Sequence, residues 1–323
     1  MIIHDRTYGT FKITNAVIKE LILSQPFQRL KKINQHGAGN YIQPDRDVTR
    51  YEHCIGTWYL SHKFKRPIEE QIASLLHDVP HTAFSHVIDY VVGNKKHEYH
   101  DHFFEKIVLN SEIPSILKKH HIRLEDILAK DRFPLLNNEL PDISVDRWDY
   151  FMRDSISMHL LPKETVTLFL KSIHEKEERF YFTDLGIASQ FTILFLNYAR
   201  LLTLDATSHG SFFLISEAIK LGLKGNYIKQ EDFFSTDDVL MQQLKDTQDE
   251  AILGLLNRLQ PGREFVYAEK EDAEFYGPLK ARFVDPWVLH KKKFYQVSDL
   301  IPGMKEYLLE FKARYSYLGV NQT

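Results

Sequence analysis

The stretch SLLHDVPHTAFSHVID, Ser74–Asp89, places His77 directly beside Asp78 at the end of an apolar run. The run, EEQIASLL at residues 69–76, has the spacing of an amphipathic helix. If that helix ends near Asp78, the adjacent imidazole and carboxylate can both reach one metal ion from the helix terminus. A His-Asp dipeptide alone is more often a surface pair or a helix cap, so its meaning depends on partners elsewhere in the chain.

Two distant segments supply such partners. His53 lies 24 positions before His77, in RYEHCIGTWYL, and Asp146 lies 68 positions after Asp78, in SVDRWDYF. Imidazoles and carboxylates suit a borderline divalent ion, which lowers the pKa of bound water. Cys54 is the only cysteine, so a thiolate-built zinc site is excluded. The sequence therefore predicts that His53, His77, Asp78 and Asp146 are the ligands of a divalent metal site, with Mn, Fe, Mg, Zn and Ni all left open and with room for one ion or two.

Further histidines follow the pair closely. His81 and His86 lie four and nine positions after His77, and Asp89 lies on the same predicted helix as His86. A histidine can donate a proton to a leaving oxygen near neutral pH, because its unperturbed pKa is about 6.5. We therefore expect His86 to act as a general acid oriented by Asp89, with His81 and His97 beside the phosphate.

Composition limits the class of protein. The chain has 323 residues, 43% of them hydrophobic, which is enough for one sizeable core. A net charge of −3 argues against a broad surface for duplex nucleic acid, so nucleic-acid binding is possible but not indicated. No stretch of roughly 18 uninterrupted apolar residues and no secretory signal is present, so we expect a cytoplasmic protein without a membrane partner.

The hydrophobic pattern favours a mostly α fold. Helical spacing recurs over residues 13–33, 51–64, 68–92 and 102–118, and again over 186–203 and 211–223. Another helix is predicted to begin near Ser144 or Val145, and residues 173–183 read as a short hairpin. The pieces REFVYAE, KARFVD and KKFYQVSDL alternate like strands before a last helix over 304–315. We expect a helical domain over 1–262 and a small α+β C-terminal lobe over 263–323.

Four motifs occur in a fixed order. They are FQRLKKINQHGAGNYIQPDRDVTRYEHCIG at 27–56, LLHDVPHTAFSHVID at 75–89, KHE at 96–98 and VDRWDYFMRD at 145–154. In this order and at this spacing they resemble the deoxynucleoside triphosphate triphosphohydrolases of the HD superfamily, which include the human enzyme with sterile-alpha-motif and HD domains and bacterial dGTPase-like relatives. The resemblance continues more weakly to about residue 268, and it implies an HD-domain helical bundle.

The resemblance also implies roles for individual residues. It implies the same four metal ligands, His86 supported by Asp89 as the acid, and His81 near the phosphates. The substrate contacts that it implies are Gln35, Arg50, His97, Arg147, Tyr150, Asp154 and Arg200. Without the motif, Arg50 and Arg147 would read as surface ion-pair residues and Tyr150 as a core residue.

Two positions depart from the family pattern. Arg147 stands where relatives often carry a lysine that binds phosphate, which keeps the charge and changes the geometry. His36 stands where the deoxynucleotide-specific relatives have an aliphatic side chain that crowds a ribose 2′-hydroxyl. The preference between ribose and deoxyribose is therefore open.

The sequence thus predicts a metal-dependent phosphohydrolase that converts a (deoxy)nucleoside triphosphate into nucleoside and triphosphate. A nucleotidase or phosphodiesterase acting on a mono- or cyclic nucleotide is the alternative within enzymes. A non-catalytic nucleotide-binding regulator is the alternative outside them. The resemblance also implies a homo-oligomer.

Overall fold

Two capped helices, α4 (Arg50–Lys63) and α11 (Val145–Ser157), carry predicted metal ligands. Thr49 caps α4 in a capping box: its hydroxyl accepts from the Glu52 amide, and the Glu52 carboxylate accepts from the Thr49 amide. The Ser144 hydroxyl accepts from the Arg147 amide at the start of α11. Because such caps satisfy first-turn amides that have no partner inside the helix, they fix where each helix begins. Both caps place a ligand within the first turns.

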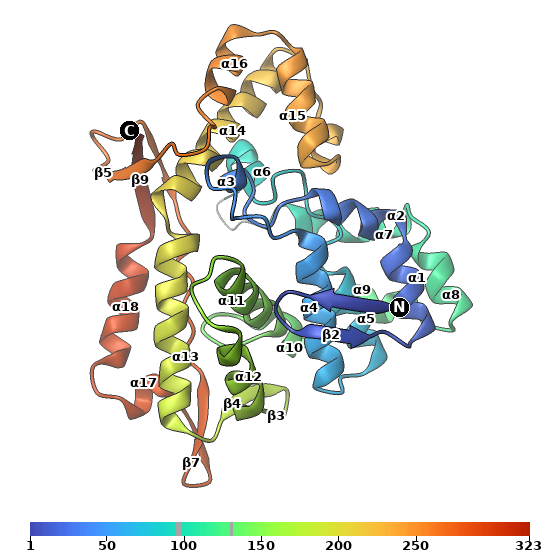
Figure 1. Ribbon diagram of the computed structural model, residues 1–323. Helices are drawn as coiled ribbons and strands as arrows, with labels where there is room; N and C mark the ends of the chain where they lie inside the picture. The colour runs from blue at the N-terminus through green and yellow to red at the C-terminus, as the bar shows by residue number, and fades with distance from the viewer. Residues whose placement is uncertain (95–97, 130–131) are drawn as a thin grey trace.

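The structure, a computed structural model, describes residues 1–94, 98–129 and 132–323. It is mostly α, as the sequence predicts, with small sheets in its C-terminal region (Figure 1). The α-helices other than α4 and α11 are α1 (Ala16–Leu23), α2 (Gln25–Arg29), α3 (Gly39–Ile42), α5 (Ile68–Leu76), α6 (Val87–Val92), α7 (Phe104–Leu109), α8 (Ile113–Lys119), α9 (Leu124–Leu128), α10 (Pro134–Asn137), α12 (Lys163–Ser172), α13 (Leu185–Tyr198), α14 (Ala206–Lys224), α15 (Asp237–Asp246), α16 (Glu250–Leu256), α17 (Val297–Leu300) and α18 (Met304–Arg314). Shorter 3-10 and π turns are η1 (Leu30–Lys32), η2 (His100–Phe103), η4 (Ala199–Thr203) and η5 (Gln230–Phe234).

The strands form three small sheets. An N-terminal hairpin pairs β1 (Ile2–Asp5) with β2 (Gly9–Lys12). The predicted hairpin over 173–183 is confirmed as β3 (Ile173–Lys176) and β4 (Arg179–Phe182), and the C-terminal strands β7 (Trp287–His290) and β8 (Lys293–Gln296) extend it in the order β3-β4-β7-β8. The third sheet has the order β5-β9-β6, from β5 (Phe265–Ala268), β9 (Tyr317–Gln322) and β6 (Phe275–Pro278).

Two large apolar cores meet at the centre of the molecule. One is built mainly on α1, α4, α5, α11 and α13, and the other on α6, α14, α15 and α16 with β5 and β9. In Figure 1, α15 and α16 lie above α4 and α11, with α3 and α6 between them. Residues of both groups line the same cavity, which is where the predicted site residues gather.

One expected strand, the KARFVD segment, is absent. Residues 280–285, the KARFVD segment, have no regular secondary structure. The amide directly before this segment and the amide at its end bind distant carbonyls, because Leu279 N donates to Ser316 O and Asp285 N donates to Pro141 O. The KARFVD prediction was therefore wrong, because the segment is a crossing loop.

Leu185–Lys224, which comprises α13, η4 and α14, is long and apolar enough to span a membrane by length and composition alone. In the fold, 44% of its most apolar window is buried.

Candidate metal centre and active site

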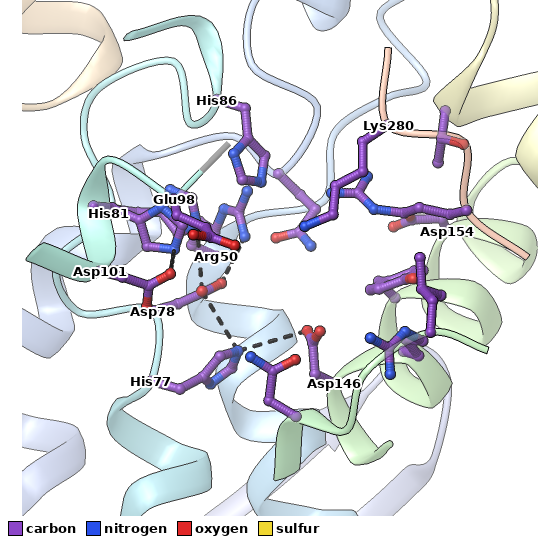
Figure 2. A pocket seen from close by; sticks show the side chains of 18 of the residues that line it. Arg50, His77, Asp78, His81, His86, Glu98, Asp101, Asp146, Asp154 and Lys280 are labelled. Carbon is purple, nitrogen blue, oxygen red and sulfur yellow. Dashed lines mark hydrogen bonds and ion pairs between the residues drawn. The ribbon is translucent and has the colours of Figure 1, made fainter. Parts of the chain in front are cut away.

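The four predicted metal ligands converge on one point. His53 Nε2 lies 3.0 Å from Asp146 Oδ1 and 3.2 Å from His77 Nε2. Asp78 closes the set, with Oδ1 3.4 Å from His77 Nε2 and Oδ2 3.7 Å from His53 Nε2. Atoms that each bind an ion at about 2.0–2.2 Å lie roughly 3 Å from one another. His53, His77 and Asp146 are therefore close enough to share one cation, whereas Asp78 lies beside them and forms a second possible ligand group with His81 and His100. Figure 2 shows His77, Asp78 and Asp146 at one wall of the cavity.

The outer nitrogens of both imidazoles have partners that fix the tautomer. His77 Nδ1 lies 2.8 Å from Ser74 O, a carbonyl that can only accept, so Nδ1 carries the proton. His53 Nδ1 donates in the same way to Asp149 Oδ2 at 2.8 Å. Each ring therefore turns its Nε2 toward the other ligands, and the neutral ring with its proton on Nδ1 offers that nitrogen to a metal ion.

Asp149 is held by a buried ion-pair chain that the sequence reading missed. Arg153 forks onto Asp149, with Nε and Nη2 2.9 and 3.0 Å from the two carboxylate oxygens, and its Nη1 reaches Asp5 at 2.9 Å. A Cβ at Gly56 would lie 1.8 Å from Asp149 Oδ1, so α4 needs glycine there to admit the carboxylate. The usable signal was the helical spacing of Asp146, Asp149 and Arg153, which directs all three toward α4.

The electrostatics of the ligands favour a bound cation. Burial opposes ionisation of Asp78 and Asp146, yet Arg50 and the facing histidines hold the pKa of Asp78 well below its usual value, and hydrogen bonds from His53 and His77 lower the pKa of Asp146. Burial likewise disfavours the charged imidazoles, but the carboxylates raise the pKa of both histidines. A site that keeps its carboxylates ionised and attracts protons to its imidazoles also attracts a metal ion, which competes with those protons.

A second group of side chains lies beside the ligands. Arg50 donates to Asp78 Oδ2 at 2.7 Å and to Ser85 Oγ at 2.9 Å, and His81 Nε2 lies 3.3 Å from Asp78 Oδ1. Burial and the positive charge of Arg50 lower the pKa of His81 well below its ordinary value, so this ring is neutral and offers an N–H. His100 stacks on His81 with ring centroids 3.7 Å apart.

His86 and Asp89 form the expected pair. His86 is the N-cap residue of α6, and its Nδ1 lies 3.0 Å from Asp89 Oδ2, three residues further on. Asp89 Oδ1 also accepts from the Tyr99 amide, so the carboxylate is held in place. The other ring edge of His86 is directed into the cavity (Figure 2).

One cavity of about 660 Å³ joins these groups to most of the predicted substrate contacts. Such a volume is in the range of sites for nucleotide-sized ligands. The predicted contacts that line it are Gln35, Arg50, Arg147, Tyr150 and Asp154. His97 lies outside the described residues.

Arg200 is placed away from the cavity. It lies exposed on η4, donates to the Tyr307 hydroxyl and stacks near Phe311 of α18. Its guanidinium is therefore engaged by the C-terminal helix on the outside of the fold, whereas the prediction placed it against the substrate.

Two basic side chains reach the cavity from the C-terminal loop over 279–286. Lys280 and Arg282 line it, and the Arg282 guanidinium lies 5.8 Å from the centre of the Tyr150 ring. Partial burial and the charge of Arg282 lower the pKa of Lys280. Figure 2 shows Lys280 beside Asp154, across the cavity from His77. Sequence reasoning missed both residues because it assigned KARFVD to a strand.

Comparisons with known proteins agree with this geometry. A family model described as HD domain matches residues 50–154. The uncharacterized protein YdhJ of Bacillus subtilis is 35% identical over 301 residues, which cover 93% of this chain and 92% of YdhJ. The metal-dependent phosphohydrolase cns2 of Cordyceps militaris is 33% identical over 174 residues, 54% of this chain and 50% of cns2. The chain therefore belongs to the HD superfamily, and it is a metal-dependent phosphohydrolase that uses a divalent cation.

More distant matches extend over parts of the chain or share only its fold. The mouse deoxynucleoside triphosphate triphosphohydrolase SAMHD1 is 26% identical over 204 residues, 47% of this chain and 31% of SAMHD1. The chain thus spans half of cns2 and about a third of SAMHD1. A phosphohydrolase from Bacteroides thetaiotaomicron superposes with a TM-score of 0.73 over 99% of this chain and 98% of its own, at 17% identity.

Proposed function

We propose that this phosphohydrolase cleaves a nucleoside triphosphate at the α-phosphate and releases nucleoside and triphosphate. The observation that carries the proposal is a single cavity with the His/Asp cluster at one wall and Arg50, Arg147, Lys280 and Arg282 around it. A polyanionic tail needs several cationic partners, and arginine forks suit phosphate oxygens. The likeness to SAMHD1, by its printed name a deoxynucleoside triphosphate triphosphohydrolase, supports the same substrate class.

In the proposed reaction, each part of the chain has a separate task. His53, His77, Asp78 and Asp146 hold the cation, which when bound polarises the phosphoryl group and acidifies water. Arg50 and the His81 N–H lie next to Asp78, where they can neutralise charge on the phosphate. His86, held by Asp89, donates a proton to the leaving 5′-oxygen.

The test is a panel of ribo- and deoxyribonucleotides with Mn²⁺, Fe²⁺, Mg²⁺, Zn²⁺ or Ni²⁺, in which products are separated by chromatography. Nucleoside and tripolyphosphate in equal amounts are the expected products. Turnover of mono- or cyclic nucleotides with every triphosphate left intact would replace the proposal with a nucleotidase or phosphodiesterase. Thermal stabilisation by nucleotides without product under any metal would replace it with a binding regulator.

Two further properties of the chain are part of the proposal. We place the protein in the cytoplasm, and we expect the homo-oligomer that the family resemblance implies. Light scattering coupled to size-exclusion chromatography, with and without nucleotide, measures the assembly, and a monomer under both conditions would contradict it.

A further inference from the structure

The proposed acid pair, His86 and Asp89, is carried by a short helix. α6 has six residues, with His86 as its N-cap residue, and it is followed by Gly93, which has a φ of +71°. A helix of this length is not stable in isolation, so the elements that it packs against set its place in the fold. The direction of the His86 ring therefore depends on what holds α6.

Apolar contacts join α6 to α14. Val87 and Ile88 lie in the same buried core as the central residues of α14. The Tyr90 ring also stands nearly perpendicular to the rings of Phe212 and Phe213, at interplanar angles of 89° and 81°. Apolar burial is not directional, so it specifies the rotation of a six-residue helix only weakly.

A directional link crosses the same interface. The Tyr90 hydroxyl lies 3.1 Å from His209 Nδ1, and His209 Nε2 lies 3.0 Å from Thr203 O. A carbonyl can only accept, so the ring carries its proton on Nε2, and Nδ1 accepts from the Tyr90 hydroxyl. Burial lowers the pKa of His209 to about 4 and raises the pKa of Tyr90. Near neutral pH the imidazole is therefore neutral and the hydroxyl keeps the proton that it donates.

The α14 end of this link is itself held in place. His209 lies in the first turn of α14, and the N-cap residue of that helix, Asp205, accepts from Arg46 Nη2 at 2.9 Å. Thr203 is the last residue of the π turn η4, a rare geometry that is frequent at functional sites. The acceptor that the Tyr90 hydroxyl meets is therefore part of a fixed framework.

We propose that Tyr90 and His209 are positioning residues for the acid pair. Tyr90 follows His86 by four residues, about one helical turn, so both side chains leave the same face of α6, and both line the cavity. The hydrogen bond to His209 fixes the rotation of that face and keeps the His86 ring directed at the leaving oxygen. This inference rests on the proposed function, in which His86 is the acid, and goes beyond it by naming the residues that hold the acid in place.

A comparison of two leaving groups tests this role. When the bond between phosphorus and the 5′-oxygen of a nucleotide breaks, the proton of His86 goes to that oxygen. The p-nitrophenolate of bis(p-nitrophenyl) phosphate leaves without a proton, because its charge is delocalised over the ring. A misplaced acid should therefore slow hydrolysis of the nucleotide and spare the ester.

Tyr90→Phe removes the hydroxyl and keeps the ring. We expect kcat for the nucleotide to fall about five- to tenfold, with KM and the kcat for the ester each within about twofold of wild type. His209→Leu removes the acceptor and should give the same pattern, and the double variant should lose no more than either single variant. His209→Gln keeps an acceptor and a donor and should restore at least about half of the wild-type kcat.

Tyr227→Phe, at an exposed tyrosine that follows α14, is the matched control and should equal wild type on both substrates. The nucleotide used is the one that wild-type protein hydrolyses fastest. A mono- or cyclic nucleotide also releases an alkoxide oxygen, so the comparison still decides the inference if the triphosphate proposal fails. Melting temperatures of all variants show that each is folded during the assay.

Equal losses on the nucleotide and the ester in Tyr90→Phe would overturn the inference and leave the proposed function standing, because the hydroxyl would then support the whole site. An unchanged kcat, or a rise in KM alone, would overturn it as well. Wild-type protein that hydrolyses the ester but no nucleotide would overturn both the inference and the proposed function.

Discussion

Asp149 acts on the metal centre through one hydrogen bond to His53. The carboxylate fixes the tautomer and orientation of the imidazole, and Arg153 holds the carboxylate in turn. Such outer partners of metal ligands typically account for 10- to 100-fold in metal affinity. The contribution of Asp149 is therefore measurable without altering any ligand.

We predict that Asp149→Asn weakens binding of the divalent ion by about 10- to 100-fold. The neutral amide supports the imidazole less well and releases one arm of Arg153. Competition with a coloured chelator measures the dissociation constant. Asp246→Asn, at an exposed carboxylate on α15, is the control and should bind metal like the wild type. Equal affinities for the two variants would show that Asp149 does not support the site.

The glycine opposite Asp149 gives a second prediction. Gly56→Ala should lower the free energy of unfolding by at least about 1–3 kcal/mol, because the new Cβ overlaps Asp149 Oδ1 and forces the helices apart. Gly254→Ala, in α16 with open space around the new Cβ, should instead be neutral or stabilise by up to about 1 kcal/mol. Urea unfolding of both variants measures the difference, and similar values would contradict the close packing at Gly56.

At the residue scale, sequence spacing was enough to select the four side chains that converge. His77 and Asp78 are adjacent in the sequence, and the helical patterns around His53 and Asp146 indicate which faces of those helices turn inward. The same helical spacing places Asp149 on the face of Asp146, but its contact with His53 across two helices is known only from the fold. The hydrogen bond between Tyr90 and His209 is likewise invisible before the chain is folded.

At the element scale, the first residue of α15, Asp237, bonds to two loops that form part of the cavity wall. The two carboxylate oxygens accept from the Asn34 amide at 2.8 Å and the Phe84 amide at 2.6 Å. One amide precedes the turn that holds His36 and the other lies between His81 and His86. The helix thus ties together the two loops that form this part of the cavity wall.

Burial raises the pKa of Asp237 from 3.8 to about 7. Between about pH 4 and 7 the folded protein therefore holds a proton that the unfolded chain releases. The contribution of Asp237 to the free energy of unfolding is complete below about pH 4, falls as the pH rises, and is lost above about pH 7. We predict that Asp237→Asn, which cannot titrate, removes this decline, a difference of at most about 4 kcal/mol. Urea unfolding at pH 4 and pH 8 measures it, and parallel pH dependences for variant and wild type would contradict it.

The loop over 279–286 gives the fourth prediction. Lys280→Ala should raise KM for a nucleoside triphosphate roughly five- to tenfold, because it removes a charged partner of the phosphate tail. The variant should also be inhibited less by free tripolyphosphate. Steady-state kinetics measure both effects. Lys292→Ala, in the exposed turn between β7 and β8, is the control, and an unchanged KM in Lys280→Ala would remove Lys280 from phosphate binding.

Helices were easier to predict than the C-terminal strands. The long amphipathic patterns of α4, α11, α13 and α14 are repeated over several turns, and caps such as Ser144 define where a helix begins. KARFVD alternates like a strand, yet the amide directly before it and its last amide bond to Ser316 and Pro141 in distant segments. Local alternation cannot distinguish a ladder from a crossing loop, since the partner segments decide the outcome.

At the scale of the whole molecule, the cavity is shared between distant parts of the chain. The matched HD segment over 50–154 contains all four converging ligands, whereas Gln35 and His36 precede it and Lys280 and Arg282 follow it by more than a hundred residues. The proposed boundary near residue 262 stays a prediction. A boundary there would place two of the cavity's basic groups on the C-terminal lobe.

Metal removal is the test at this scale. Dialysis against EDTA should abolish phosphohydrolase activity and lower the melting temperature, because the ion binds only the folded arrangement of ligands. Restoring the ion at 100 times its dissociation constant should return about 2.7 kcal/mol of stability. Calorimetry before and after dialysis measures the shift. Full activity after exhaustive chelation would contradict the metal-dependent mechanism.

The ion pair between Arg153 and Asp5 connects the N-terminal β1–β2 hairpin to the metal site. Four successive side chains, Asp5, Arg153, Asp149 and His53, run from the β1–β2 hairpin to the cation site. A label, antibody or crosslink that displaces the first strand would therefore alter ion retention at a distance. A probe attached to the hairpin would therefore disturb metal binding, and it belongs elsewhere on the surface.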